Sequence, residues 1–363
     1  MDKVLTIAVP AYKIENYLIK CVESMTKIQD KERLDILVID DGSPDRTGEL
    51  SDKLALKYPE CVRVIHQENK GHGGAINTAI GEAKGRYFKV VDGDDWVDHS
   101  ALEELVDCLE KADEDVLFHD YVEIYEKIRK KRRFSLPFQA AKTFKISELK
   151  RTDFLAMHSF VYKTALLKAM PVRIDEHCYY VDLEYSLCPL WWAKSFCYEP
   201  LPVYQYRLER EGQSVSPEGF RKHVKDHERV LFTLVDFYKT YCENAGEVSG
   251  EPTGEASDGP TGEASDKPPT GMGRKYMAYQ IADRYLRHIL KCCRYLDGKK
   301  GSVSSYLKNM DEKMKASSPY LYDYLLQEES RKGSLSNLQL RLLRGTGFKI
   351  WPLVRLKWKF TGK

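Results

Sequence analysis

The sequence has little of what would place it in a membrane or in an oxidising compartment. None of its 363 residues lies in an apolar run that approaches the roughly 18 residues of a membrane-spanning helix. The apolar run near the N-terminus is too short for a signal peptide and is typical of a strand. The nine cysteines form no CxxC pair and follow no regular spacing. We therefore expect a cytoplasmic protein whose thiols are reduced.

Two common nucleotide-binding motifs are also absent. The chain has no GxxxxGK[ST] loop, and GxGxxG does not follow its first expected strand. Gly71 and Gly73 follow the third expected strand instead, and no third glycine stands in register with them. A glycine pair of this kind is more typical of a tight turn than of a phosphate cradle. Both of these familiar nucleotide sites are therefore disfavoured.

The chain does contain enough apolar residues for a large core, since 42% of them are hydrophobic. Its length allows one large domain with an appendage. We expect a first domain over residues 1–245, a linker over 246–273 and a helical extension over 274–363. The linker contains PTGEASD twice, starting at Pro252 and Pro260, and its Pro, Gly, Ser and acidic composition predicts disorder.

Strands and helices are expected to alternate through the first 110 residues. Continuous apolar runs predict strands that are buried on both faces of a parallel sheet, at residues 4–9, 34–39, 62–66 and 87–91. The intervening segments predict helices at residues 15–28, 44–58 and 75–84. We expect Ser43 to cap the second helix, and Ser100 with Glu103 to form a capping box at the next one. This order predicts an α/β fold with a mostly parallel, doubly wound sheet.

Three carboxylates, Asp92, Asp94 and Asp95, follow the fourth expected strand. Burying unpaired carboxylates is costly and neighbouring carboxylates repel each other, so we expect a cation beside them. Mg²⁺ or Mn²⁺ typically binds one or two carboxylates and completes its shell with phosphate oxygens and water. The alternative interpretation is a polar turn that only ends the strand.

Two other expected strands also end in unusual residues. The first ends at Pro10-Ala11-Tyr12, and the second ends at Asp40-Asp41. In a doubly wound sheet, ligands bind in the crevice at the carboxyl ends of the strands. The three strand ends should therefore lie side by side, which favours a site for a metal and a phosphate over the polar turn.

Three segments together resemble the family 2 glycosyltransferases, namely AVPAYKIENYL, LVIDDGSPDRT and HQENKGHGGAINTAIGEAKGRYFKVVDGDDW. Their order, spacing and placement at strand ends agree with the family over residues 3–110, and the similarity continues more loosely to about residue 215. The resemblance implies the GT-A fold, a Rossmann-like and mostly parallel central sheet with flanking helices. A C-terminal helical extension follows it here.

The resemblance also implies which residues bind a nucleotide sugar: Pro10, Ala11, Tyr12, Asp41, Lys70, Gly71, Asp92, Gly93, Asp94 and Asp95. The first three match positions that line the base, and Asp41 matches a carboxylate that hydrogen-bonds the uracil edge. Lys70 and Gly71 match a loop near the diphosphate or donor sugar. The DxD element matches Asp92 to Asp94, which implies a divalent metal, Mn²⁺ or Mg²⁺, held by Asp94 and Asp92. Asp95 is implied to support the metal's outer shell or the sugar hydroxyls.

The family places its catalytic base in a later acidic motif, which aligns with residues 174–185. The family commonly has Glu-Asp at the position where this chain has Val181-Asp182. Asp182 aligns best as the base, and Glu184 is the alternative. Asp182 could also cap a helix expected over residues 183–194. Further on, Tyr206-Arg207 with Gln213-Ser214 loosely resembles a late active-site loop of the family.

The function implied is that of an inverting glycosyltransferase that moves a sugar from a nucleoside-diphosphate sugar, a UDP-sugar, to a glycan or lipid-linked acceptor in cell-surface polysaccharide synthesis. A metal would neutralise the leaving diphosphate and a carboxylate would take the acceptor's proton. The QxxRW motif of processive synthases is absent. The alternatives are a non-catalytic sugar-nucleotide or glycan-binding scaffold of the same fold, or a nucleotidyltransferase. No nucleic-acid partner is expected.

Two basic segments remain. The run KIRKKRR at residues 127–133 follows an expected strand and suits either a charged edge strand or a phosphate-binding patch. Helices are expected over 276–296 and 305–328. The last segment, GTGFKIWPLVRLKWKF, combines cations with aromatic residues. It suits peripheral contact with the anionic inner face of the plasma membrane, or docking on the protein itself, with Pro352 interrupting any single helix.

Overall fold

The computed structural model describes residues 3–150, 155–209, 213–243, 273–296, 300–327 and 335–361. The chain divides into two compact units. Unit 1 consists of residues 1–148 and 152–230, and unit 2 of residues 149–151 and 231–363. Except for Gly273, the linker predicted over 246–273 lies outside the described residues. Its disorder and the domain boundary predicted at residue 245 stay predictions.

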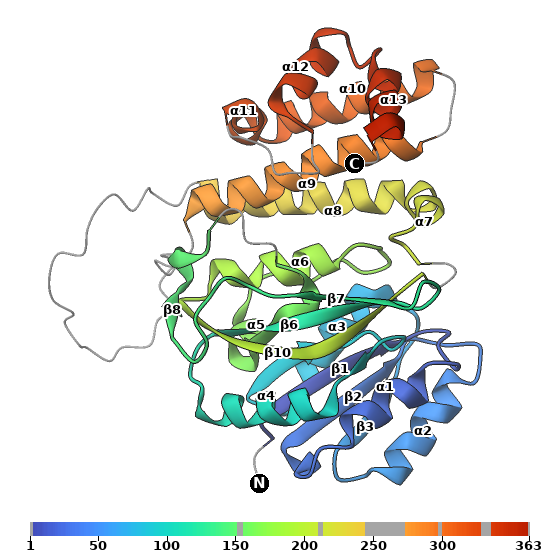
Figure 1. The fold of residues 1–363 in the computed structure, drawn as a ribbon, viewed down its shortest axis with the longest axis vertical. Helices are drawn as coiled ribbons and strands as arrows, with labels where there is room; N and C mark the ends of the chain where they lie inside the picture. The colour runs from blue at the N-terminus through green and yellow to red at the C-terminus, as the bar shows by residue number, and fades with distance from the viewer. Residues whose placement is uncertain are drawn as a thin grey trace, which may run out of the picture. The chain divides into compact units, whose positions relative to one another are not determined.

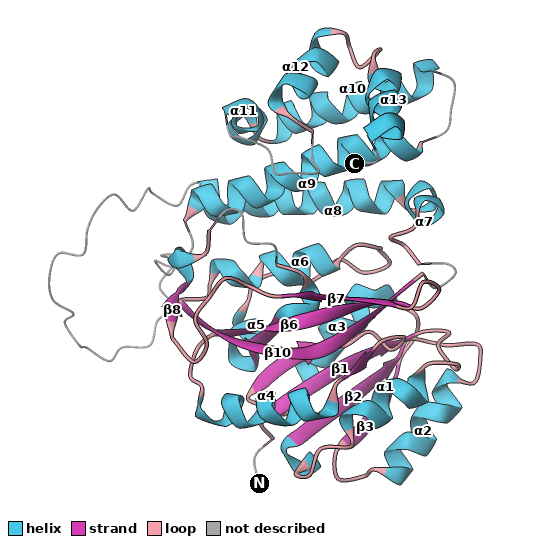
Figure 2. Cartoon of the chain, viewed as in Figure 1, coloured by secondary structure: helices cyan, strands magenta, loops and turns pink. Residues whose placement is uncertain are grey.

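Unit 1 is built around one mixed sheet (Figure 2), whose main path has the strand order β3-β2-β1-β4-β9-β6-β10-β5. Its strands are β1 Leu5–Ala11, β2 Leu34–Asp40, β3 Val62–His66, β4 Tyr87–Val90, β5 Trp96–Val97, β6 Val116–Tyr125, β7 Lys130–Phe134, β8 Phe144–Lys145, β9 Phe160–Lys163 and β10 Ser195–Leu208. Strands β1 to β4 pair in parallel, and β9 pairs antiparallel with β4 and β6. The predicted α/β fold with a mostly parallel central sheet is confirmed.

Helices flank both faces of this sheet (Figure 1). Those of the first half are α1 Leu18–Met25, α2 Thr47–Lys57, α3 Gly71–Glu82 and α4 His99–Lys111. Later in the chain come α5 Thr164–Ala169, α6 Asp182–Leu187, α7 Pro217–Lys222 and α8 Val224–Phe237, which ends in unit 2. Apolar side chains of α1 and α4 share one core with Leu5, Ile7 and Val9 of β1. Helices α3 and α5 contact each other on the opposite face.

Two predicted helix starts are wrong. Helix α2 begins after Arg46, because Ser43 is used in the preceding loop, where its N–H donates to Asp40 and its hydroxyl to the carbonyl of Ala11. Helix α4 is capped by Asp98, whose carboxylate accepts the N–H of Ala101 at 3.0 Å. Both helices therefore exist where they were predicted, but α2 begins after Arg46 rather than after Ser43. In α4, Asp98 rather than Ser100 supplies the cap.

The basic run at residues 127–133 folds as predicted for an edge strand. Strand β7 pairs antiparallel with β6 alone, and most of its side chains are exposed. Arg133, although exposed, donates a hydrogen bond to the buried carboxylate of Asp120 at 2.7 Å. Charged side chains on such an edge discourage pairing with another sheet.

Unit 2 is helical over its described residues, as predicted. It contains α9 Arg274–Tyr295, α10 Lys300–Ser317, α11 Pro319–Gln327, α12 Asn337–Gly345 and α13 Trp351–Thr361. The carboxylate of Asp311 lies at its centre and accepts hydrogen bonds from Tyr285 and Arg344. Phe348 and Trp351 of the basic tail are buried, whereas Leu353 and Leu356 are exposed. Among the described helices of the chain, none combines the length and apolarity needed to cross a bilayer.

Candidate active site

The carboxylate of Asp41, directly after β2, binds the loop between β3 and α3. This side chain is only 3% exposed, and its oxygens accept the main-chain N–H groups of Lys70 and Gly71, both at 2.8 Å. The side chain of Gln67 donates to it at 2.6 Å. The N–H of Asp41 in turn donates to the carbonyl of Ala11 at 2.9 Å. Asp41 therefore fixes the loop at residues 67–71 and binds N–H groups that the start of α3 would leave unpaired.

The first turn of α3 connects this loop with the carboxylates that follow β4. The ring nitrogen Nε2 of His72 lies 2.8 Å from a carboxylate oxygen of Asp92. Gly71 has a φ of +77°, a left-handed conformation that glycine adopts without strain. Because adjacent residues of one helical turn reach Asp41 and Asp92, the predicted strand ends do lie around one site.

The same helix holds the segment that carries the predicted base. The side-chain amide of Asn77 donates to the carbonyl of Ile174 at 2.8 Å and accepts its N–H at 3.1 Å. The N–H of His177 donates to the carbonyl of Lys70 at 2.7 Å. A Cβ on Gly73 would overlap the carbonyl of Asp175, so only glycine allows this close approach. Residues 174–177 are thus bound along the first two turns of α3.

The three carboxylates after β4 have different surroundings. Asp95 is 2% exposed and accepts the hydroxyl of Tyr204 at 2.6 Å and the N–H of Arg207 at 2.7 Å. Asp92 is half-buried and faces His72. Asp94 is half-buried between them, and its main-chain carbonyl accepts the Nε of Arg207 at 3.0 Å. Strand β10 therefore holds the far side of the turn through Tyr204 and Arg207.

Burial and neighbouring charges shift the pKa values of these carboxylates in different directions. Burial, and then the charges of Asp94 and Asp92, raise the pKa of Asp95 well above its ordinary value. Burial works against ionisation of Asp92 as well, but the charge and hydrogen bond of His72 lower the pKa of Asp92. Burial disfavours the charged form of His72, yet the charges of Asp92, Asp182 and Asp94 raise its pKa. The three carboxylates therefore differ in how strongly their surroundings favour the charged form.

Asp182 and Glu184, the two candidate bases, point into different environments. The charge of Asp182 acts on His72 and on Tyr206, which also sense Asp92 and Asp94. Glu184 is 2% exposed and accepts the N–H of Asp175 at 2.8 Å. It borders a small internal cavity beside Ile174, and burial raises the pKa of Glu184 to about 8. Asp182 is the first residue of α6, and Val181 occupies the N-cap position before it.

A layer of buried polar side chains lies beneath the turn, and the sequence reasoning missed it. Lys89 of β4 is fully buried and donates to the carbonyl of His158 at 2.7 Å. The ring of His158 packs against those of Tyr204 and Tyr206, with centroid distances of 4.5 and 4.2 Å. Burial lowers the pKa of Lys89 well below its ordinary value and that of His158 to about 4. A lysine inside the apolar run YFKVV was the available signal.

The position of Gly93 in the turn leaves no room for a side chain. A Cβ there would overlap the Cδ1 of Ile14 and lie 3.0 Å from the carbonyl oxygen of Pro10. The turn therefore packs directly on the end of β1. Of the other residues predicted to bind the nucleotide sugar, Tyr12 is 44% exposed and Lys70 is exposed. Both are accessible to a ligand at the strand ends.

The donor set around Asp94 suits a divalent metal of the predicted kind. Carboxylate oxygens are hard ligands, and Mg²⁺ or Mn²⁺ needs only one or two of them when substrate phosphates complete the shell. Among the described residues, no group of three or more His, Cys, Asp or Glu side chains has the geometry of a metal cage built from protein ligands alone. The residues present therefore fit a metal shared with a phosphate rather than a metal enclosed by the protein.

Similarity to known proteins agrees with this site. The profile of Glycosyl transferase family 2 matches residues 6–173. Glycosyltransferase GlyG of Streptococcus pneumoniae serotype 4 is 38% identical over 122 residues, which is 33% of this chain and 40% of GlyG. The uncharacterized glycosyltransferase EpsJ of Bacillus subtilis is 36% identical over 117 residues, which is 32% of this chain and 33% of EpsJ. The aligned part of this chain thus spans less than half of these relatives.

Solved structures extend the similarity of the fold over almost the whole chain. S. aureus TarS 1–349 in complex with UDP has a TM-score of 0.63 at 18% identity and covers 99% of this chain and 92% of that chain. Its complex with UDP-GlcNAc has a TM-score of 0.63 at 17% identity and covers 98% and 91%. At this identity the likeness concerns the fold. Residues 6–173 of this chain are thus similar to glycosyl transferase family 2, and the chain has a GT-A-like fold.

Proposed function

We propose that this protein is an inverting glycosyltransferase that transfers a sugar from a UDP-sugar to a glycan or lipid-linked acceptor. The observation that carries the proposal is the shared electrostatic environment of the two carboxylate sets. Asp182, from residues 174–185, and Asp92 with Asp94, from the end of β4, act on the same two side chains, His72 and Tyr206. The transfer requires a carboxylate base and metal-binding carboxylates that lie close enough to act on the same donor sugar.

The donor would bind along the ends of β1, β2 and β4. In this proposal Pro10, Ala11 and Tyr12 line the base, and Asp41 positions Lys70 and Gly71 toward the diphosphate. Support for a uridine nucleotide comes from TarS, which shares the fold and has been solved with UDP and with UDP-GlcNAc. Asp94, with Asp92, would hold Mg²⁺ or Mn²⁺, which when bound supplies positive charge to the departing diphosphate.

Asp182 is the proposed base because its alternative is protonated. With a pKa of about 8, Glu184 keeps its proton at neutral pH and cannot accept another. In the proposed step the acceptor hydroxyl gives its proton to the Asp182 carboxylate while its oxygen forms a bond to the anomeric carbon. The bond from that carbon to the diphosphate breaks, and its electron pair leaves with the nucleotide. Attack opposite the leaving group inverts the anomeric configuration.

The acceptor and the cellular location belong to the proposal as well. Relatives such as GlyG and EpsJ align over less than half of their length, so their activities support only a related transfer. We infer a glycan or lipid-linked acceptor in surface polysaccharide synthesis. Contact of the basic tail with an anionic membrane would bring the enzyme to such an acceptor, and the exposed Leu353 and Leu356 are the described apolar residues available for it.

The test is hydrolysis of a panel of nucleotide sugars with and without Mn²⁺ or Mg²⁺, measured as released nucleoside diphosphate. We expect slow, metal-dependent release of UDP from one donor. Binding of UDP with no hydrolysis of any donor, even with acceptor glycans added, would instead support the non-catalytic scaffold. Release of pyrophosphate from a nucleoside triphosphate and a sugar phosphate would support a nucleotidyltransferase.

A further inference from the structure

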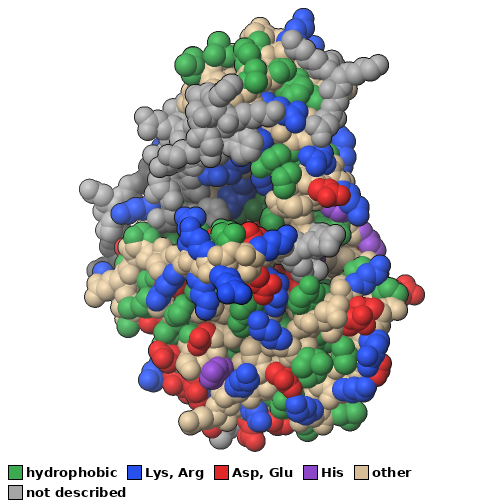
Figure 3. Space-filling view, turned by 45° about the vertical axis from the view of Figure 1, so that its right-hand side comes forward, with side chains coloured by type: hydrophobic (Ala, Val, Ile, Leu, Met, Phe, Trp, Pro, Cys, Tyr) green, Lys and Arg blue, Asp and Glu red, His purple; other side chains and the backbone are tan. Residues whose placement is uncertain are grey.

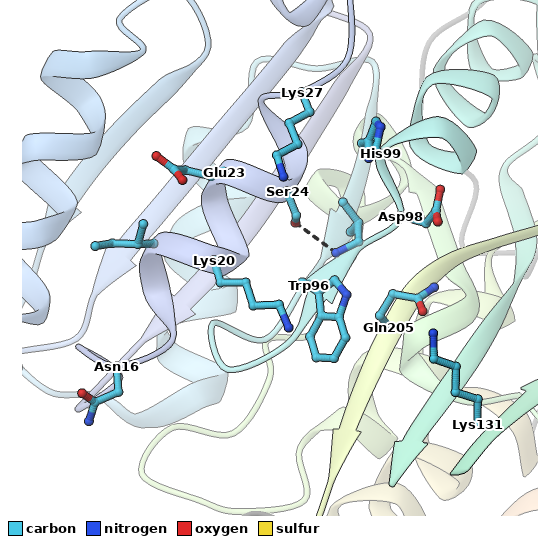
Figure 4. Close-up of a pocket in the computed structure, with 12 residues that line it drawn as sticks. Asn16, Lys20, Glu23, Ser24, Lys27, Trp96, Asp98, His99, Lys131 and Gln205 are labelled. Carbon is cyan, nitrogen blue, oxygen red and sulfur yellow. Dashed lines mark hydrogen bonds between the residues drawn. The ribbon is translucent and has the colours of Figure 1, made fainter. Parts of the chain in front are cut away.

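A second concave region of unit 1 lies beside Trp96, the residue that follows the three carboxylates after β4. This pocket has a volume of about 650 Å³ and is lined by residues of α1, β5, β7, β10 and the start of α4 (Figure 4). Lys20 and Lys27 come from α1 and the turn after it, Lys131 from β7, and Trp96 from β5. None of the ten residues predicted to bind the nucleotide sugar lines it. A pocket of this size can take a small ligand.

The lining carries positive charge that the protein itself does not neutralise. Within the described part of the chain, Lys20, Lys27 and Lys131 form no ion pair within 4 Å, whereas many other lysines do. Over much of the surface, basic and acidic side chains are interspersed (Figure 3), consistent with a net charge of only +2. These three ammonium groups, from α1, the turn after it and β7, line one hollow.

The acidic side chains of the pocket are already engaged elsewhere. Glu23 accepts hydrogen bonds from Lys57 at 2.6 Å and from Tyr58 at 3.2 Å. Asp98 caps α4 through the N–H of Ala101. Three lysines against two carboxylates, one of them paired with Lys57 outside the pocket, give the lining a net positive charge that favours an anion.

Trp96 connects the pocket to the carboxylate turn. It follows Asp95 directly in the sequence, and the ammonium of Lys20 lies 3.3 Å from the centre of its ring. The guanidinium of Arg207, whose Nε binds the carbonyl of Asp94, lies 5.0 Å from the same ring. The cation–π contact holds Lys20 in one position before any ligand arrives, which lowers the entropic cost of binding an anion there.

We propose that this pocket binds a phosphate group carried by the acceptor. The proposal rests on the proposed glycosyltransferase function, because it assigns the ligand to the acceptor of that reaction. The pocket contains none of the ten residues predicted to bind the nucleotide sugar and adjoins them through Trp96, and this position favours the acceptor over the nucleotide sugar. Lysine ammonium groups act as point charges that suit a phosphate group, whereas a carboxylate is better matched by the planar fork of arginine.

The edge strand β7 extends the same positive surface away from the pocket. Arg129, Lys130 and Arg132 are exposed and form no ion pair among the described residues. An acceptor that bears a phosphate on each of several units would place one in the pocket and others along β7. The basic run at residues 127–133 would then serve both as a protected edge and as a binding surface.

The direct test is chemical labelling of lysines in the full-length protein, mapped by mass spectrometry. UDP is added in excess throughout so that the donor site is filled, and glucose 6-phosphate is the probe, with glucose as the uncharged control. We expect glucose 6-phosphate, but not glucose, to protect Lys20, Lys27 and Lys131 several-fold. Equal labelling of these lysines with the two sugars would overturn the proposal.

A charge-matched pair of variants provides the second test. K20Q/K27Q/K131Q removes the pocket cations, and K53Q/K111Q/K145Q removes three exposed lysines that do not line the pocket. We expect the first variant to bind glucose 6-phosphate roughly tenfold more weakly than the second, with UDP-sugar hydrolysis unchanged in both. Equal binding by the two variants would refute the phosphate site. Absence of hydrolysis in the unmodified protein, with the pocket protection retained, would instead count against the glycosyltransferase function.

Discussion

The two halves of the unit 1 sheet hold their polar groups in different ways. In the first half, β1 to β4, the predicted functional groups stand at the strand ends, although Asp35 and Lys89 are also buried within strands. There Asp41 is bound by the main-chain N–H groups of Lys70 and Gly71. In the second half, polar side chains lie within buried strands. Asp120 of β6 is bound by the side chains of Arg133, Ser135 and Tyr198.

This difference has a consequence for how each half tolerates change. Geometry that depends on main-chain groups survives most side-chain substitutions, provided that the required glycines stay. Geometry that depends on a network of buried side chains fails when one member is lost, because each remaining polar group is then left without a partner. We therefore expect the donor half to be sensitive at a few positions and the second half to be sensitive at many.

The largest effect is expected where the donor half contributes a charged side chain directly. Asp94→Ala removes the first predicted metal contact, so metal-dependent UDP-sugar hydrolysis should fall by about a thousandfold or more. The thermal midpoint should change little, since Asp94 is only half-buried. The matched control is Asp30→Ala, a carboxylate outside the site. Full activity in the Asp94 variant would remove this residue from the metal site.

A somewhat smaller effect is expected at the proposed base in the second half. Asp182→Asn keeps the size of the side chain but cannot accept a proton, and turnover should fall roughly a hundredfold. The Kd for UDP, measured by calorimetry, should stay unchanged, in contrast to the Asp94 variant when metal is present. If transfer to the acceptor proceeded at the normal rate, the base would have to be sought at another residue.

The buried carboxyl of Glu184 predicts a pH dependence of stability. Its pKa is about 8 in the folded state against an ordinary 4.5, so folding retains a proton that unfolding releases. The stabilisation is fully present below pH 4.5 and is lost as the pH rises through 8. Between pH 6 and pH 8 the free energy of unfolding should fall by about 2–3 kcal/mol from this group.

Glu184→Gln removes this ionisation while keeping a similar shape. Denaturant unfolding at pH 6, 7 and 8 should therefore show a shallower decline in the Gln variant than in the unmodified protein. Glu32→Gln, an exposed position, is the control and should leave the slope as it is. Parallel declines in all three proteins would mean that Glu184 ionises normally in the fold.

The smallest effect tests the main-chain geometry of the donor half. Gly93→Ala places a methyl group against Ile14 and the carbonyl of Pro10, and the resulting overpacking should cost about 1–3 kcal/mol of stability. Gly81→Ala is the matched control, because a Cβ there meets nothing within 4 Å. It should be neutral or slightly stabilising, since it lies in α3. Equal stability of the two variants would show that the turn shifts without cost.

The donor half could be predicted from the sequence because its signals are local. Continuous apolar runs marked β1 to β4, and residues that bind at the strand ends stood next to those runs. Even the errors were small, since Ser43 and Ser100 lie within three residues of the true caps, Arg46 and Asp98. These features depend on neighbours in the chain, which a sequence displays directly.

In the second half the edge strand β7 was predicted, whereas the contacts of β10 were not, because the partners of β10 are distant in the sequence. Tyr204 binds Asp95 across 109 positions, and Arg207 binds the carbonyl of Asp94 across 113. The helix expected over 183–194 ends at Leu187, and Pro189, which lacks an N–H, begins a short 3₁₀ turn. Likewise, Pro319 starts a new helix and divides the one expected over 305–328.

The hydrogen bond between the N–H of His177 and the carbonyl of Lys70 bears on the kinetics of the enzyme. It connects the loop that is predicted to lie beside the donor diphosphate with the segment leading to Asp182. In the proposed function, a nucleotide sugar that orders this loop on binding also positions Asp182. This happens before the acceptor hydroxyl binds. We expect an ordered sequential mechanism in which the nucleotide sugar binds first and the nucleotide leaves last.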